Sequence, residues 1–331
     1  MQPAVLPLPD ALVVEVCEEA DADVLWLPEL EPPQAATAIA TIRAESGAVR
    51  TGRKETTSPR DNPRPMPLSP LAAKYDNLLL DLDGCVWIGS ACTRGAPEAV
   101  AELRSSGKDL AFVTNDSRRS PEEYVRKLWS LGLRASLEEV VTVGAAIQHL
   151  LATRGLGKRT FVIGSQAIWR HVSDSGQRIV NGSNRAAFAE VVVVAGHDAF
   201  DFAELRTATR ALLAGAEMIA ADRDATFPTD DGLAPGTGSI LAALEFATGR
   251  TAQIVGKPEP QIFQTALDRV GKGSTLVVGD RLDSDLAGAA AAGLDAAIVL
   301  TGVTSRADAE SAADPAPVAI AEDLHALLLG S

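Results

Sequence analysis

The chain has 331 residues, and its 46% of hydrophobic and 22% of charged residues are those of a globular protein of about two domains. Its formal net charge is −14, and Lys and Arg form no clustered run, which argues against a nucleic-acid-binding protein. The three cysteines are too few for a disulfide framework and no apolar run approaches the length of a membrane span, so we expect reduced thiols, a cytoplasmic location and no membrane anchor.

The first 74 residues differ from the rest of the chain. Prolines recur near the start, and residues 51–70 are rich in Pro, Ser, Thr and charge, which is typical of a linker. A short helix is expected at 35–43. We interpret residues 1–74 as an N-terminal extension, flexible or only partly folded, rather than as a catalytic domain.

From Tyr75 onward, strand and helix signals alternate along the chain. Short apolar runs predict strands at 77–81, 110–114 and 140–143, and the segments after them predict helices at 96–105, 121–131 and 145–153, with Ser120 as a helix cap. This alternation is typical of a parallel sheet with helices on both faces.

A second alternating block follows, from about residue 158 to residue 251. Its expected strands lie at 160–163, 190–195 and 217–221, and its expected helices at 202–214 and 239–248. The first pattern then resumes, with helices at 262–270, 284–292 and 324–329 and strands at 275–279 and 296–300. The predicted fold class is therefore α/β.

Two carboxylates stand at the end of the first apolar strand. Residues 78–80 are leucines, Asp81 and Asp83 follow, and Gly84 allows a turn. In an extended chain the two carboxylates share a face, so that one can attack a phosphorus atom while the other moves protons. Taken alone, the segment is equally compatible with an ordinary polar turn.

Three further strand ends carry residues that suit the same chemistry. Thr114 and Asn115 bring a hydroxyl and backbone N–H groups that can hold phosphate oxygens. Lys257 can neutralise a phosphoryl group, and Asp280 and Asp285 offer the oxygen ligands that magnesium prefers. Each segment alone has a plain alternative, as a loop, a surface lysine or a helix cap. Because ligands of open α/β sheets bind at the carboxyl ends of the strands, we expect all four segments to converge.

Taken together and in this order, the four segments resemble the motifs of the haloacid dehalogenase-like hydrolase superfamily. The likeness is greatest to its subfamily IIA, the branch that contains 4-nitrophenylphosphatase, NagD and pyridoxal phosphate phosphatase. The residues that carry it, besides those named above, are Trp87, 114–117, 222–224, 227–228, 235–239, 255–258 and 279–285. The likeness runs from about residue 77 to residue 303.

The resemblance implies a role for each matching residue. Asp81 would be the nucleophile and a magnesium ligand, and Asp83 the general acid and base that lends its backbone carbonyl to the metal. Thr114 and Asn115 would bind the transferring phosphoryl group. Lys257 would stabilise its charge.

The resemblance also implies the rest of the metal site and the substrate contacts. Asp280 would be the main remaining ligand of Mg2+, supported by Asp285. Arg118 and the loop 222–228 are the candidates for substrate contact. Phe227 stands where pyridoxal phosphate phosphatases carry a His, which argues against that substrate. The family usually has Asn where this chain has Asp116, which puts one contact in doubt but not the chemistry.

The same resemblance implies the domain organisation. Residues 75–157 and 252–331 would form a Rossmann-like, doubly wound parallel-sheet core. Residues 158–251 would form an inserted α/β cap domain of the C2 type, which covers the crevice, excludes water and chooses the substrate. A homodimer is also expected on this ground.

The expected function is that of a magnesium-dependent phosphatase that hydrolyses a small phosphate monoester through an aspartyl-phosphate. Glycerol 3-phosphate, phosphoglycolate and sugar phosphates are the expected substrates, and nucleotides or pyridoxal phosphate are the alternatives. A dehalogenase, a phosphomutase, a phospho-receiver signalling domain and a non-catalytic binding protein remain open. The sequence does not identify the natural substrate or the cap residues that select it.

Overall fold

The computed structural model describes residues 67–229 and 232–330. The helix expected at 35–43 and most of the linker expected at 51–70 lie outside these residues. Within them, the strands and helices expected from the sequence are confirmed, most with ends that agree to within about two residues. No helix of this part combines the length and hydrophobicity needed to cross a membrane.

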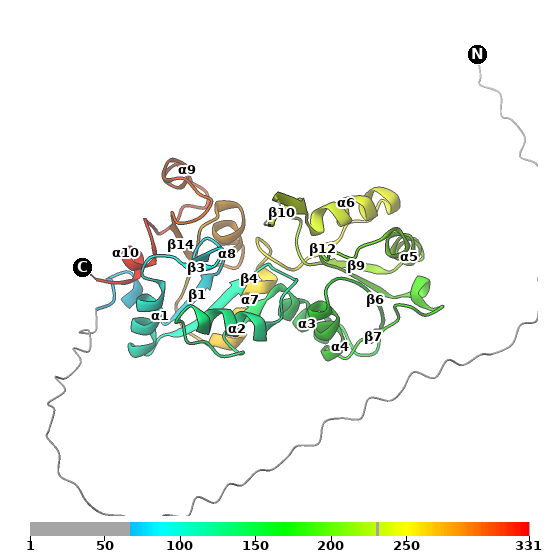
Figure 1. Ribbon diagram of the computed structural model, residues 1–331, viewed down its shortest axis with the longest axis horizontal. Helices are drawn as coiled ribbons and strands as arrows, with labels where there is room; N and C mark the ends of the chain where they lie inside the picture. Colours follow the sequence, from blue (N-terminus) through cyan, green and yellow to red (C-terminus); the bar gives the residue numbers. More distant parts are fainter. Residues whose placement is uncertain (1–66, 230–231, 331) are drawn as a thin grey trace, which may run out of the picture. The chain divides into compact units, whose positions relative to one another are not determined.

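The first sheet has six strands, and every neighbouring pair in it is parallel (Figure 1). Its strands, in spatial order, are β15 (Ala319–Ala321), β14 (Asp295–Val299), β13 (Thr275–Gly279), β1 (Asn77–Asp81), β4 (Asp109–Thr114) and β5 (Val140–Thr142). The central strands β1 and β13 are buried at every position. A strand with both faces covered needs apolar residues on both, which explains the unbroken apolar runs in the sequence.

Helices cover both faces of this sheet. The helices are α1 (Ala96–Ser105), α2 (Pro121–Ser130), α3 (Val143–Thr153), α7 (Pro260–Val270), α8 (Ala287–Ala291), α9 (Arg306–Ser311) and α10 (Leu324–Leu328), with a 3-10 turn η1 (Ala72–Lys74) and a π-helical turn η3 (Leu282–Leu286). Leu79 packs in one apolar cluster with α3, α7 and α8, whereas Leu78 and Leu80 pack in another with α1, α2 and α10. This alternation along β1 confirms the doubly wound core.

A second, five-stranded parallel sheet lies between α3 and α7 in the chain, where the cap was expected. Its order is β12 (Gln253–Ile254), β9 (Glu217–Ala220), β8 (Val191–Val194), β6 (Arg159–Ile163) and β7 (Arg178–Ile179). Its helices are α4 (Gln166–Asp174), α5 (Phe202–Leu213), α6 (Thr237–Thr248) and the turn η2 (Ala186–Phe188). The sheet thus extends past residue 251, to Ile254.

Several short elements were not expected from the sequence. They are two hairpins, β2–β3 (Trp87–Ile88 and Ala91–Cys92) and β10–β11 (Thr226–Thr229 and Gly232–Pro235), together with α4, α9, β7, β12, β15 and the 3-10 turns η1 and η2. Two-residue strands carry too few residues for a hydrophobic period, so tertiary pairing alone defines them.

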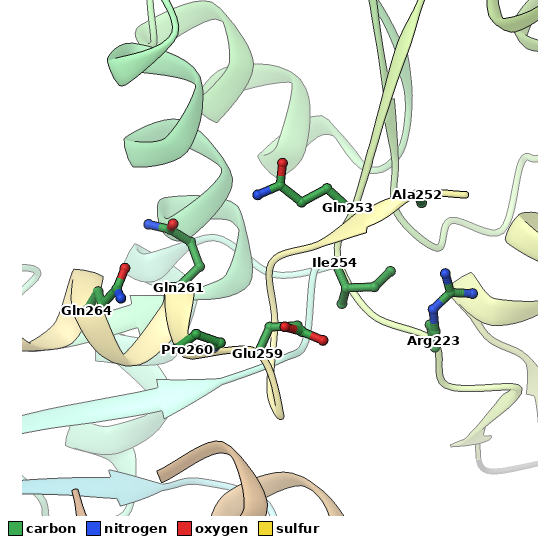
Figure 2. A pocket seen from close by; sticks show the side chains of 8 residues that line it. All are labelled: Arg223, Ala252, Gln253, Ile254, Glu259, Pro260, Gln261 and Gln264. Carbon is green, nitrogen blue, oxygen red and sulfur yellow. The ribbon is translucent and has the colours of Figure 1, made fainter. Parts of the chain in front are cut away.

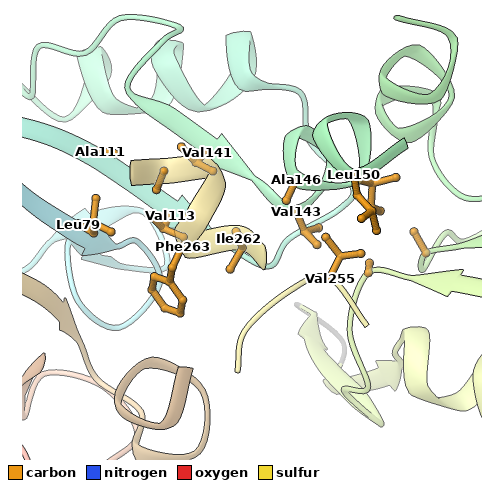
Figure 3. Packing of buried hydrophobic residues seen from close by; sticks show 14 of the residues in the cluster. Leu79, Ala111, Val113, Val141, Val143, Ala146, Leu150, Val255, Ile262 and Phe263 are labelled. Carbon is orange, nitrogen blue, oxygen red and sulfur yellow. The ribbon is translucent and has the colours of Figure 1, made fainter. Parts of the chain in front are cut away.

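One apolar cluster is shared by the two sheets. It joins Leu79 and Val113 of the first sheet to Val193 and Ile219 of the second. Figure 3 shows Val143, Ala146 and Leu150 of α3 within it, together with Val255, which follows β12. The residues just before Lys257 are therefore anchored in the shared core.

Candidate active site

The polar residues predicted from the sequence lie at the carboxyl ends of neighbouring strands. β1 pairs with β13 on one side and with β4 on the other, with Leu80 opposite Val278 and Asp81 opposite Val113. Asp81 ends β1, Thr114 ends β4, and Asp280 follows β13. The parallel register therefore brings these three residues to one edge of the sheet, as expected.

Lys257 lies between two buried carboxylates. Its Nζ donates to Oδ1 of Asp81 and, at 2.7 Å, to Oδ1 of Asp285. Burial lowers the pKa of Lys257, but attraction to Asp285 and Asp81 outweighs it and the net pKa is raised. Lys257 is therefore a permanent cation at neutral pH.

The site holds more negative than positive charge. The carboxylate oxygens of Asp81, Asp280 and Asp285 lie within 4.8 Å of one another, and all three residues are buried. Burial raises the pKa of Asp280. Its Oδ2 accepts a hydrogen bond of 2.7 Å from the backbone N–H of Val303, whereas its Oδ1 is buried and has no hydrogen-bond partner. Three carboxylates against one lysine, with one carboxylate oxygen of Asp280 free to bind a ligand, fit a hard divalent cation such as Mg2+.

The loop after β14 holds Asp280 in place, and no prediction from the sequence covered it. Besides the Val303 contact, the N–H of Thr304 donates to the carbonyl oxygen of Asp280 at 3.2 Å. The Thr301 hydroxyl donates to the carbonyl oxygen of Gly84 at 2.5 Å. Like the motifs of Asp81, Thr114 and Asp280, this loop follows the carboxyl end of a core strand, and that position was the signal available for it.

Gly84 lets the first motif approach the last one. Its φ is +90°, and a Cβ atom built there would lie 2.5 Å from Oδ2 of Asp280. A side chain at this position would therefore strain the backbone and displace the carboxylate. The turn after Asp83 requires glycine for both reasons.

Asp83 lies apart from the buried cluster and is exposed. Its Oδ1 accepts a hydrogen bond of 2.7 Å from Nε1 of Trp87. The buried Trp87 ring stacks on Tyr124 with centroids 6.1 Å apart, and Nζ of Lys127 lies 3.9 Å from the Trp87 centroid. Asp83 thus faces solvent with its orientation set by an indole N–H.

The second motif forms the opposite wall of the site. Thr114 is buried, and its Oγ1 accepts from the N–H of Asp116 at 3.1 Å. The amide of Asn115 bonds both main-chain polar groups of Lys257. Asp116 accepts from the Tyr124 hydroxyl at 2.6 Å and from the N–H of Arg118 at 2.9 Å, so it orders this loop from within.

Arg118, a candidate for substrate contact, reaches from this loop to Phe227 of the loop 222–228 in the cap. Its guanidinium carbon lies 3.2 Å from the centroid of the Phe227 ring in β10. Its Nε is buried without a hydrogen-bond partner, and its Nη1 lies 3.7 Å from Asp116. The guanidinium is therefore held by an aromatic face and retains a free donor.

A cavity of about 360 Å³ borders the segment that carries Lys257. Figure 2 shows Arg223 and Ile254 on its cap side and Glu259 and Gln261 at the start of α7. Arg223 is itself paired with Glu245 at 2.8 Å. The carboxylate cluster does not line this cavity.

Comparison with known proteins agrees with this geometry. A family model described as haloacid dehalogenase-like hydrolase matches residues 78–178, and one described as HAD-hydrolase-like matches residues 254–327. D-glycerol 3-phosphate phosphatase of Mycobacterium tuberculosis is 40% identical over 260 residues, which cover 78% of this chain and 72% of that protein. Human chronophin is 34% identical over 261 residues, 74% of this chain and 87% of that protein.

A solved structure agrees with the family models and with the sequence relatives. The glycerol phosphate phosphatase of Mycobacterium tuberculosis in complex with magnesium superimposes with a TM-score of 0.72 at 40% identity, over 78% of each chain. The Mycobacterium tuberculosis relative and this fold neighbour are both named as phosphatases. The chain therefore belongs to the haloacid dehalogenase-like hydrolases and is a phosphatase of their subfamily IIA.

Proposed function

We propose that this phosphatase requires Mg2+ and hydrolyses a small phosphate monoester through an aspartyl-phosphate formed on Asp81. The supporting observation is the Lys257 ammonium between Asp81 and Asp285, next to the unpartnered oxygen of Asp280. Asp81, Asp280 and the backbone carbonyl of Asp83 would hold the metal, with Asp285 in support. When bound, Mg2+ neutralises charge on the phosphoryl oxygens and on the carboxylates.

In this mechanism Asp81 is the nucleophile and Asp83 transfers the protons. A carboxylate oxygen of Asp81 attacks phosphorus in line, and the bond from phosphorus to the substrate oxygen breaks. Asp83 donates its proton to that leaving oxygen. It then takes a proton from water, whose oxygen attacks phosphorus and breaks the bond to Asp81. Both carboxylates return to their starting states and phosphate leaves.

The remaining site residues bind the phosphoryl group. The Thr114 hydroxyl and the backbone N–H of Asn115 would donate to its oxygens, and Lys257 would offset its charge. Burial strengthens these interactions because water does not compete for them.

Among substrates, we propose a small polyol phosphate, with glycerol 3-phosphate first and phosphoglycolate or a sugar phosphate next. The glycerol 3-phosphate phosphatase of Mycobacterium tuberculosis supports this choice. So does Arg118, whose partly exposed side chain lies against Phe227 and could donate to a substrate oxygen there. An apolar ring at this position offers no hydrogen bond to a pyridine ring.

A phosphate-release screen tests the proposal. Glycerol 3-phosphate, phosphoglycolate, sugar phosphates, nucleotides and pyridoxal phosphate are assayed with Mg2+ and with EDTA. Phosphate release from glycerol 3-phosphate in Mg2+ but not in EDTA would support the proposal. Faster release from nucleotides or pyridoxal phosphate would show that one of these is the substrate instead. Full activity of Asp81→Asn would overturn the mechanism.

The domain limits, the assembly and the location are also proposals. From the sequence we infer a core of residues 75–157 and 252–331 and a cap of residues 158–251, acting in the cytoplasm without nucleic acid or membrane partners. Because β12 and Gly256 pair with the cap strand β9 and the residue after it, we propose that the second boundary lies after Gly256 instead of after residue 251. The unpaired thiols of Cys85 and Cys92 are consistent with a reducing compartment. A homodimer is supported by apolar side chains exposed on cap helices, Phe202, Leu213 and Phe246. Light scattering that gives a monomer mass would remove the dimer.

A further inference from the structure

We infer that Asn115 is a positioning residue for Lys257: its side chain fixes the main chain of Lys257 to the core at the point where the chain leaves the cap. This inference rests on the proposed function, because it assumes that Lys257 binds the phosphoryl group. It assigns the Asn115 side chain to Lys257 and leaves only the backbone N–H of Asn115 for phosphate.

A single amide satisfies both main-chain polar groups of Lys257. Oδ1 of Asn115 accepts from the N–H of Lys257 at 2.8 Å, and Nδ2 donates to its carbonyl oxygen at 2.9 Å. Only Asn and Gln present an acceptor and a donor side by side in a neutral group. The contact joins residues 142 positions apart in sequence, so it links the second motif to the third.

The hydrogen-bond partners of the chain change at this point. The N–H groups of Val255 and Gly256 donate to Ala220 and Ala221 at 3.0 Å and 2.7 Å, so both residues extend the pairing of β12 with β9. The next N–H, that of Lys257, donates to Asn115 instead. The connection from cap sheet to core therefore falls between Gly256 and Lys257.

Gly256 has no room for a side chain. A Cβ atom built there would lie 2.6 Å from the carbonyl oxygen of Ala221 and 2.6 Å from Oδ1 of Asn115. The cap strand and the Asn115 amide thus contact this residue from two sides. On the cap side, Val255 is fully buried in the shared apolar cluster.

These contacts explain why Lys257 needs an anchor. Its ammonium has to lie between Asp81 and Asp285 at the end of a long side chain with four rotatable bonds. Without the amide, the N–H and the carbonyl oxygen of Lys257 lose their partner on the core strand β4 side, and the starting point of the side chain is less well fixed relative to Asp81 and Asp285.

A double-mutant cycle tests the inference. Asn115→Ala, Lys257→Ala and the double variant are compared with wild type for kcat/KM on 4-nitrophenyl phosphate and for calorimetric affinity for inorganic phosphate, both in Mg2+. We expect Asn115→Ala to lower kcat/KM by about 100-fold, the cost of a misplaced catalytic group. In the Lys257→Ala background, the same change should cost less than about threefold. If Asn115→Ala lowered kcat/KM by the same factor in both backgrounds, the Asn115 side chain would contact phosphate directly, and the inference would be overturned.

Asn181 provides a matched control. Its amide bonds both main-chain groups of Val162 in the cap, at 2.9 Å and 2.8 Å, in the same reciprocal way. Asn181→Ala should lose comparable thermal stability and keep kcat/KM within about twofold. A drop equal to that of Asn115→Ala would show a general loss of structure. Should Asn115→Ala fail to fold, Asn115→Ser replaces it, because a single hydroxyl cannot bridge both groups.

The cycle separates this inference from the proposed function. Lys257→Ala with wild-type kcat/KM and phosphate affinity would remove Lys257 from the proposed site, and the inference with it. If Lys257→Ala instead lowers kcat/KM by a factor that multiplies independently with the factor for Asn115→Ala, this result would leave the proposed function intact and overturn only the role of Asn115.

Discussion

Nε1 of Trp87 donates a hydrogen bond of 2.7 Å to Oδ1 of Asp83. Trp87 is buried and its ring is stacked on Tyr124, so the donor is fixed while Asp83 itself is exposed. Because the indole N–H does not titrate, it aims the carboxyl group without competing for its proton. In the first step, the orientation of Asp83 matters only when the leaving oxygen needs that proton.

Trp87→Phe should therefore slow substrates according to their leaving group. We expect kcat/KM, which reports the first step, to fall about tenfold or more for glycerol 3-phosphate and little for 4-nitrophenyl phosphate, whose leaving group needs no proton. Steady-state kinetics on both substrates measures the ratio. Trp129→Phe is the control, because Nε1 of Trp129 bonds a backbone oxygen, that of Ala135. An equal loss on both substrates would show that Trp87 only supports the fold.

Asp280→Asn should weaken metal binding. The unpartnered Oδ1 of Asp280 faces the acidic cluster, and an amide there would remove one negative charge from the ligand set. We expect the Mg2+ concentration for half-maximal activity, and the calorimetric Kd for Mg2+, to rise by at least about tenfold. Asp283→Asn is the control from the same segment, since Asp283 is exposed and paired with Arg281. Unchanged Mg2+ affinity in Asp280→Asn would contradict the proposed ligand set.

Arg118→Ala should act on substrate binding rather than on chemistry. The contact with Phe227 is worth about 0.5–1 kcal/mol at a partly exposed site, and the guanidinium would add a substrate hydrogen bond. We expect KM for glycerol 3-phosphate to rise about fivefold to tenfold, with kcat nearly unchanged. Arg119→Ala is the control, because Arg119 also pairs with Asp116 but lacks the ring contact. A large fall in kcat alone would contradict this role.

The parts of the fold that follow from local pattern were predictable. The apolar runs ending in Asp81, Thr114 and Asp280 identified core strands and a shared sheet edge, because strand burial and the crevice rule depend on sequence order alone. The Val303 contact to Asp280 was missed because a backbone N–H donor leaves no residue signature, and the contact of the Thr301 hydroxyl with Gly84 was missed because it depends on tertiary proximity. The Asn115–Lys257 pair was missed because it depends on tertiary proximity.

Asp222 gives the cap a stability that depends on pH. Burial raises the pKa of this carboxyl to about 6, and Asp224 adds to the rise. Its ionised form accepts from the Asp224 N–H at 3.0 Å and the Thr237 hydroxyl at 3.1 Å. An unfolded Asp titrates near 3.9, so the folded state binds a proton first as pH falls, and acidification removes an unfavourable buried charge.

Asp222→Asn keeps an acceptor for Asp224 and carries no charge at any pH. Its free energy of unfolding minus that of wild type should therefore be most positive above pH 7 and should fall by about 2 kcal/mol by pH 4.5, where wild-type Asp222 is protonated. Urea denaturation of both proteins across this range measures the difference, and the other titrating groups cancel. A difference that is constant with pH, or that grows on acidification, would show that Asp222 is not a penalised buried carboxylate.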